Sequence, residues 1–73
     1  MVRRESFINK IRERRYAYKT KQKRTTLWRR KGTTDYISVP LADLIEDQFV
    51  LSSLRQAGVS DEEIRAFLQS AKS

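Results

Sequence analysis

The feature that most limits how this chain can fold is a helix that ends at a glycine in the last third of the sequence. Val50, Leu54 and Ala57 recur at helical spacing and form one apolar stripe, with Leu51 beside it. Gly58 follows at a position where helices commonly end, because glycine adopts the left-handed conformation without steric cost. We therefore predict a helix that buries this stripe and stops at Gly58.

A second helix is predicted to begin directly after this glycine. Ser60 is placed to cap it, and Glu63 stands three residues later as the capping-box partner. Val59 and Ile64 flank the cap as a hydrophobic staple, and the acidic first turn suits the helix dipole. The last third of the chain is therefore expected to be two consecutive helices.

The hydrophobic period changes near the N-terminus. Phe7, Ile8 and Ile11 form a short apolar stripe at helical spacing, which predicts a first helix starting at Ser6 or a few residues earlier. From Tyr16 onward, aromatic and threonine residues alternate with alanine and lysine. This two-residue period predicts a strand with one cationic face.

Two more strands are predicted before the C-terminal helices. Residues 25–30 and 34–39 are rich in β-formers, residues 31–32 supply a turn, and Pro40 is expected to end the last strand or to mark an edge. The order α-β-β-β-α-α predicts an α+β fold, with a three-stranded antiparallel sheet that has helices on one face and solvent on the other. At this length we expect one small domain, 1–73.

Charge is distributed unevenly along the chain. Residues 1–31 contain thirteen Lys or Arg and two acids, a net charge of +11, and residues 32–73 contain three and seven, a net charge of −4. A cationic block of this density favours phosphate as a partner, although a solvated basic arm has the same composition. The acidic half is expected either to fold back on the basic half or to receive a different, basic partner.

Nucleic acid is the partner that the basic block best fits, because Arg forks two hydrogen bonds onto phosphate and Lys acts as a point charge. The expected contacts lie on the first helix, the strands and their loops. They are Arg12, Arg15, Lys19, Lys21, Lys23, Arg24, Thr25, Arg29, Arg30 and Lys31, with Arg14 close by.

Aromatic residues are threaded through the same region. Tyr16, Tyr18, Trp28 and Tyr36 could stack on unpaired bases, which is the usual device for RNA, or could pack within the fold. For Trp28 the core is the stronger expectation, since a small domain needs its large apolar groups inside. Strand alternation puts Leu27 and Trp28 on opposite faces, and the pattern does not say which of them faces inward.

Several enzyme classes are excluded by composition. The chain has no histidine and no cysteine, so it lacks the usual base of a serine or cysteine triad and the commonest metal ligands. Glycine-rich nucleotide-binding motifs are absent. Asp43, Glu46 and Asp47 have helical spacing around a helix start and are expected to serve there as capping acids, not as a magnesium site. We therefore expect no metal and no cofactor.

Location is suggested by the same simple features. No apolar run approaches the ~20 residues that a membrane span needs, and no apolar stretch follows the basic N-terminus as it would in a secretory signal. The absence of cysteine fits a protein that forms no disulfide. We expect a cytoplasmic protein without a membrane partner.

The C-terminal motif resembles the end of HicA-type toxins, which are small mRNA interferases paired with a HicB antitoxin. The match is direct over residues 54–60, LRQAGVS, which two glutamates follow closely, as in the family. Gln22-Lys23 and the segment 37–40, ISVP, match upstream family positions at compatible distances. The resemblance spans roughly 6–69. It implies a double-stranded-RNA-binding-domain-like fold, binding of double-stranded or structured RNA, and a HicB-like partner.

The chain departs from the family where the chemistry would lie. Where the family has glycine, serine and histidine, this chain has Arg24, Thr25 and Thr26. The resemblance assigns RNA cleavage to that histidine, and a threonine hydroxyl cannot replace it as a base without an activating partner. We therefore expect an RNA-binding protein of toxin–antitoxin type that is catalytically inactive. The alternatives are an active interferase that uses another base, such as a Lys or Tyr of lowered pKa, and a DNA- or protein-binding module.

Overall fold

The computed structural model describes residues 1–71, and this part of the chain contains three helices and five strands. They follow the predicted order, with two additional short strands. In chain order they are β1 (Val2–Arg3), α1 (Arg4–Arg12), β2 (Tyr16–Lys21), β3 (Thr25–Arg30), β4 (Tyr36–Pro40), β5 (Leu44–Ile45), α2 (Asp47–Gln56) and α3 (Asp61–Ala71).

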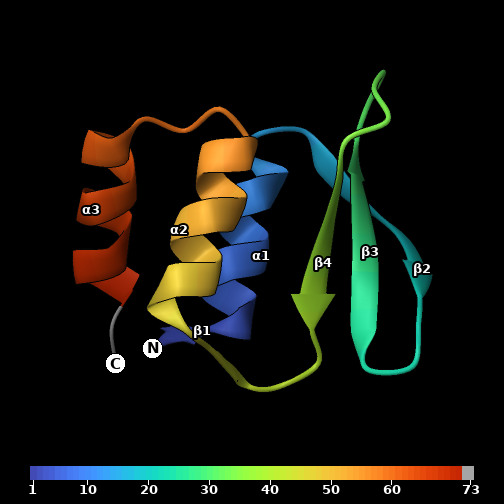
Figure 1. The fold of residues 1–73 in the computed structure, drawn as a ribbon, viewed down its shortest axis with the longest axis horizontal. Helices are drawn as coiled ribbons and strands as arrows, with labels where there is room; N and C mark the ends of the chain where they lie inside the picture. The colour runs from blue at the N-terminus through green and yellow to red at the C-terminus, as the bar shows by residue number, and fades with distance from the viewer. Residues whose placement is uncertain (72–73) are drawn as a thin grey trace.

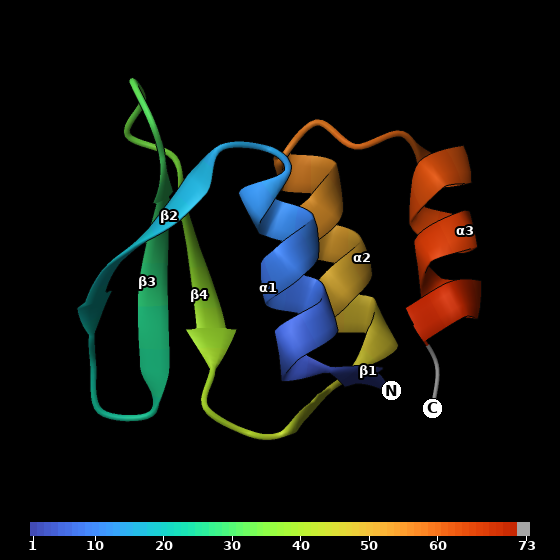
Figure 2. The ribbon, with the colours of Figure 1, turned by 180° about the vertical axis from the view of Figure 1, so that it is seen from behind.

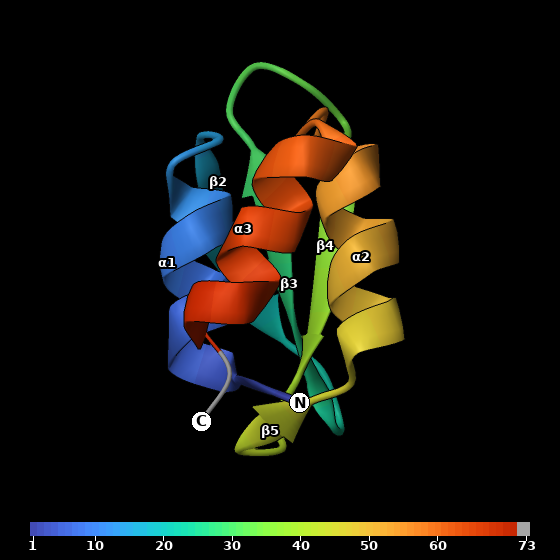
Figure 3. The same ribbon diagram turned by 90° about the vertical axis from the view of Figure 1, so that its left-hand side faces the viewer.

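The architecture has three layers (Figures 1 and 2). Strands β2, β3 and β4 form an antiparallel sheet in that order, and α1 and α2 lie on one of its faces. Helix α3 lies outside this helical layer, on the side away from the sheet (Figure 3). The predicted α+β fold with a three-stranded antiparallel sheet is therefore confirmed, and its helices occupy a single face.

The two unpredicted strands form a small second sheet below the helices (Figure 3). β1 pairs antiparallel with β5, with Val2 opposite Ile45. Both residues are buried, so this pair closes the lower end of the core. A two-residue strand has no hydrophobic period, and for that reason the sequence pattern does not reveal it.

The start of α1 agrees with the expectation of a start a few residues before Ser6, whereas the start of the third strand differs from the prediction. Helix α1 begins at Arg4, ahead of Ser6, because the extended Arg3 leads straight into it from β1. The third strand begins at Tyr36 and not at residue 34, because the preceding residues belong to the β3–β4 turn. In that turn the backbone N–H of Asp35 donates to Oγ1 of Thr33 at 3.1 Å. β4 ends at Pro40, as predicted.

The core is built from every layer. Phe7 and Ile11 of α1, Val39 of β4, Leu54 of α2 and Ile64 of α3 are all fully buried. Burying each such side chain contributes about 1.5–3 kcal/mol, which a domain of this size needs. The core therefore sits between the sheet and the helices and extends outward to α3.

The inward residue of the central strand is Trp28, which is only 4% exposed. It lies opposite Ile37 in the β3–β4 register, and both side chains face the helices. Leu27 lies opposite Ser38 on the outer face and is partly exposed. The larger ring is inside because it removes more apolar surface from water.

The turn between α2 and α3 has the predicted glycine termination. Gly58 adopts a φ of 85°, the N–H of Val59 donates to the carbonyl of Leu54, and the N–H of Gly58 donates to that of Arg55, both at 3.0 Å. These two bonds form a complete Schellman motif. The motif satisfies helix-end carbonyls that would otherwise be unpaired.

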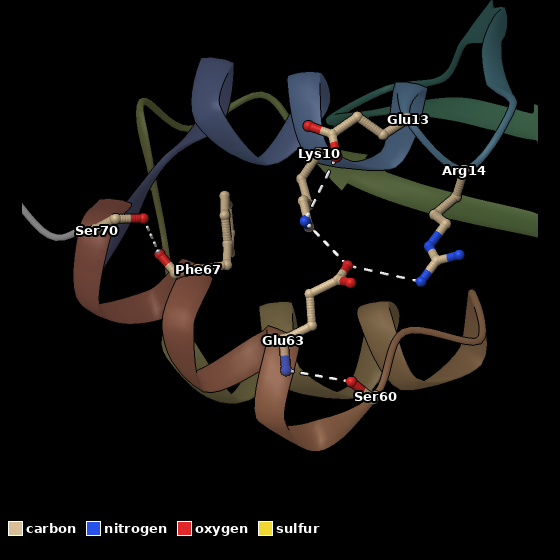
Figure 4. A network of polar contacts seen from close by, with 7 residues as sticks. All are labelled: Lys10, Glu13, Arg14, Ser60, Glu63, Phe67 and Ser70. Carbon is tan, nitrogen blue, oxygen red and sulfur yellow. Dashed lines mark hydrogen bonds and ion pairs between the residues drawn. The ribbon is translucent and has the colours of Figure 1, made fainter.

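Of the two hydrogen bonds predicted for the capping box of α3, one is confirmed. Ser60 Oγ accepts a hydrogen bond from the N–H of Glu63 at 3.2 Å, as predicted. The Glu63 carboxylate does not make the reciprocal capping-box bond among the described residues. It instead lies 3.1 Å from Lys10 Nζ and 3.6 Å from Arg14 Nη2 (Figure 4). Lys10 on α1 and Arg14 just beyond its end attract the carboxylate more strongly than a backbone N–H does.

Candidate nucleic-acid interface

The sheet separates the ten predicted contact residues into groups. Five of them line two adjoining hollows beside β2: Arg12, Arg15, Lys19, Arg29 and Lys31. Lys21, Lys23, Arg24 and Thr25 lie in or beside the β2–β3 turn, at the other end of these strands. Arg30 belongs to neither group.

The larger hollow is a groove of about 610 Å³ between the C-terminal end of α1 and β2. Its cations are exposed, whereas two of its aromatic rings are buried and form the deeper wall. We call it the aromatic groove and define it by Arg12, Arg15, Tyr16, Tyr18, Trp28 and Lys31.

The aromatic residues of the groove hold one another in place. The rings of Tyr18 and Trp28 meet edge to face, with centroids 5.9 Å apart. The Arg12 guanidinium carbon lies 5.3 Å from the Trp28 ring centroid, a cation–π distance. Tyr18 nevertheless remains 56% exposed. The groove thus offers one accessible ring beside a cationic rim.

A backbone contact brings the rim cations together from distant parts of the sequence. Helix α1 ends at Arg12, and Arg15 then reverses the chain with a φ of 70°, a left-handed conformation that usually requires glycine. The Arg15 carbonyl accepts the N–H of Lys31 at 3.0 Å. Arg15 and Lys31 therefore lie side by side where the first turn meets the β3–β4 turn.

A bulge in β2 directs neighbouring side chains to different places. The register with β3 shifts between Tyr18 and Thr20. Tyr18 pairs with Trp28 on the helix-facing side, and Lys19 reaches the outer face, where its Nζ donates to Oη of Tyr36 at 3.0 Å. The Lys19 ammonium, together with Arg29, lowers the pKa of the Tyr36 phenol, chiefly through that hydrogen bond.

Two of the expected basic residues are engaged within the chain. Arg30 forms a 2.6 Å ion pair with Asp35 and lies over the Tyr16 ring at 5.5 Å. This hydrogen bond raises the pKa of the Arg30 guanidinium. Arg14 pairs with Glu63 on α3. Both side chains help to hold the fold together, and the acidic half of the chain does fold back on the basic half at these points.

Thr26, the position that the resemblance assigns to a histidine, lies inside the protein. It is 5% exposed and faces α1. Its Oγ1 accepts from Trp28 Nε1 at 2.9 Å and from Arg4 Nη2 at 3.2 Å, and donates to the carbonyl of Val39 at 3.3 Å. One donor and two acceptor positions exhaust a hydroxyl, so Thr26 has no capacity left for a substrate.

Sequence reasoning missed Arg4 and the contacts within the groove. Arg4 lies in the first turn of α1 and donates Nε to the Pro40 carbonyl at 2.9 Å, in addition to its bond with Thr26. The pairing of Tyr18 with Trp28 follows from the hairpin register, which the pattern indicates only up to the bulge.

Metal and membrane features are absent from the part of the chain that the structure describes. Residues 1–71 contain no group of three or more His, Cys, Asp or Glu side chains that could hold a metal ion. None of their helices has the length and apolar character needed to cross a membrane. Glu46 and Asp47 lie at the start of α2, as predicted, but the N-cap residue Glu46 makes no side-chain capping bond, and Asp43 precedes β5 instead of the helix.

Comparison with known proteins found no relative: no family model, no curated protein and no solved structure matches this chain. The resemblance to HicA-type toxins therefore stays a hypothesis that rests on the sequence motifs alone.

Proposed function

We propose that the protein binds structured RNA through the aromatic groove and the neighbouring cations of β2 and β3, and that it does not cleave it. The observation that carries the proposal is the groove itself. Arg12, Arg15 and Lys31 surround an accessible tyrosine ring, and no carboxylate lines the hollow within the described residues. Cations beside stacking aromatics are the usual composition of an RNA-binding site.

Binding without cleavage follows from the state of Thr26. The resemblance places the family's catalytic group at this position, whereas here the hydroxyl is buried and fully hydrogen-bonded. We therefore carry over the fold and the RNA partner from the resemblance, but not the catalytic activity. The proposal includes a HicB-like partner whose acidic surface would cover the groove, and a cytoplasmic location, where such RNA would be met.

The decisive experiment compares two double variants of equal charge. Arg15→Gln with Lys31→Gln removes two rim cations, and Arg3→Gln with Arg65→Gln removes two exposed cations elsewhere. A charge-assisted hydrogen bond contributes about 1.5–3 kcal/mol, so the rim variant should bind a structured RNA at least about tenfold more weakly. The control variant should change binding little. Equal effects from both variants would contradict a specific site, and tighter binding to DNA of the same length would favour a DNA-binding module.

Ribonuclease activity is a second candidate, favoured by the Lys19–Tyr36 pair. The 3.0 Å hydrogen bond and the lowered pKa of Tyr36 are what a phenolate base would need. The phenolate would take the proton of a ribose 2′-hydroxyl, whose oxygen attacks the adjacent phosphorus. The bond from phosphorus to the 5′-oxygen then breaks, that oxygen takes up a proton from water, and a 2′,3′-cyclic phosphate remains. Cleavage that resists metal chelation and disappears in Tyr36→Phe would establish this activity, and intact RNA after long incubation would exclude it.

A further inference from the structure

We propose that the aromatic groove receives one unpaired nucleobase of the RNA, stacked on Tyr18, while Arg15 and Lys31 hold the adjoining phosphate. This inference rests on the RNA-binding function proposed above and narrows its ligand. The preferred RNA would contain a base that is free to leave its stack, as in a hairpin loop, a bulge or a single-stranded end.

Tyr18 has the properties of a prepared stacking surface. It is more than half exposed, although it belongs to the helix-facing side of the sheet. Its edge-to-face contact with Trp28 at 5.9 Å already restricts the ring. A ring that is held before binding loses little conformational entropy when a base stacks on it.

The size of the groove favours one base over a double helix. Its volume of about 610 Å³ falls in the range of small-ligand sites, roughly 300–1,000 Å³. In a duplex the base faces are covered by their neighbours, so a duplex can offer only its backbone to this surface. The exposed ring of Tyr18 can therefore stack on a base only when that base is unpaired.

The charges around the groove complement a nucleotide. Arg15 and Lys31 are joined through a 3.0 Å backbone hydrogen bond, so their side chains start from adjacent points on the rim. Arg12, whose guanidinium carbon lies 5.3 Å from the Trp28 ring centroid, adds a third cation to the groove. Since no acid lines the hollow among the residues described, a phosphate would meet only positive charge there.

The other exposed tyrosine of the sheet is a poorer stacking surface. Tyr36 lies on the outer face, and the Lys19 ammonium sits 5.3 Å from its ring centroid while binding its hydroxyl. Its ring is therefore partly occupied by an internal cation. Tyr18 is therefore the exposed tyrosine to test, and Tyr18→Phe, which keeps the aromatic ring, is its control.

The experiment uses the single tryptophan of the chain, Trp28, as a reporter inside the groove. The probes are hexa-adenylate, an abasic ribose-phosphate hexamer of the same charge, and a fully paired RNA duplex. Hexa-adenylate should quench Trp28 emission saturably, and the two other probes should not. Tyr18→Ala should weaken hexa-adenylate binding about 5- to 100-fold, as expected for the loss of one base–aromatic stack. Tyr18→Phe keeps the ring and should bind as the wild type does.

The outcomes separate this inference from the RNA-binding function. If Tyr18→Ala binds hexa-adenylate as well as the wild type, or if the abasic probe quenches equally, base stacking is overturned. RNA binding would still stand if the Arg15→Gln with Lys31→Gln variant weakened binding of every RNA. If none of the RNAs bind the wild type, both proposals fail. The wild-type titration decides the question even if a variant is destabilised, and thermal unfolding followed by circular dichroism checks each variant.

Discussion

At the scale of single residues, two side chains change the interpretation of the sequence. Thr26 stands where the resemblance predicts a catalytic group, yet its hydroxyl joins Trp28, Arg4 and Val39 across three elements. Arg15 occupies a left-handed position that glycine would fill without strain. The fold therefore explains why Thr26 is present. The presence of an arginine at position 15 needs a reason other than the fold.

Replacing Thr26 with valine tests its structural role. Valine keeps the shape but leaves the indole N–H of Trp28 buried without a partner, and such a group costs about 1–3 kcal/mol. We expect chemical denaturation to show that the free energy of unfolding falls by this amount, while the affinity of the groove for RNA stays unchanged. Thr26→Ser keeps the hydroxyl and should lose much less stability. A Thr26→Val protein as stable as the wild type would mean that the hydroxyl contributes nothing.

Arg15→Gly separates stability from binding. A left-handed conformation costs a non-glycine residue about 1–2 kcal/mol, part of which is offset by the greater freedom of glycine in the unfolded chain. We expect the variant to melt a few degrees higher, for a net gain of about 0.5–1 kcal/mol, and to bind RNA more weakly. If the variant melted lower, or bound RNA as before, the arginine would be serving the fold.

At the scale of elements, the motif behind the HicA resemblance is a helical corner. Leu54 and Ala57 are buried, Gly58 is left-handed, and Ser60 caps α3. Arg55 forms a fork onto Asp61 across the turn, with contacts of 2.9 and 3.2 Å. Each of these residues has a structural reason to be present. The motif therefore indicates how two helices are joined. The proposed function rests on the aromatic groove instead.

The attachment of α3 to α1 should depend on pH through Glu63. The hydrogen bond from Lys10, with the nearby charge of Arg14, lowers the pKa of the Glu63 carboxyl below its ordinary value of 4.5. A group whose pKa is lower in the folded state stabilises the fold above its unfolded-state pKa. That stabilisation is lost as the pH falls through the folded-state value.

We therefore expect Glu63→Gln to melt below the wild type at pH 7, and expect the difference to close on acidification below pH about 4. Melting curves at several pH values measure it. Glu62→Gln alters an exposed acid in the same first turn and serves as the control. A difference that stayed constant with pH would show that the ion pairs of Glu63 do not attach α3.

At the scale of the whole molecule, folding decides which positively charged side chains remain available to bind a ligand. Glu63 neutralises Lys10 and Arg14, and Asp35 pairs with Arg30. The cations that line the two hollows lie at the sheet, across the molecule from α3 (Figure 1). The uneven charge of the sequence thus becomes a local cationic surface in three dimensions.

This surface predicts a defined salt dependence of RNA binding. Five cations line the hollows, and if each neutralises one phosphate, the logarithm of the binding constant should fall with the logarithm of salt concentration at a slope of about −3.5 for single strands. The Arg15→Gln with Lys31→Gln variant should reduce this slope by about 1.4. Titrations between low and physiological salt measure both values. A slope unaffected by the variant would place the phosphate contacts elsewhere.

Local patterns in the sequence were enough for most of the fold. The helical stripes, the glycine termination, the cap of α3 and the alternation from Tyr16 all depend on residues within a few positions of one another. Secondary structure and its order are therefore readable here, because propensity and periodicity act over one or two turns of chain.

The candidate site depended on tertiary structure. Alternation puts Leu27 and Trp28 on opposite faces, but only the helices decide which face is covered. The bulge at Lys19 reverses the alternation partway along β2, and the meeting of Arg15 with Lys31 requires a chain reversal that no local pattern indicates. The sequence alone determined the elements and the excess of positive charge. The tertiary structure decided which cations and rings face a common hollow, because burial and register depend on contacts between distant segments.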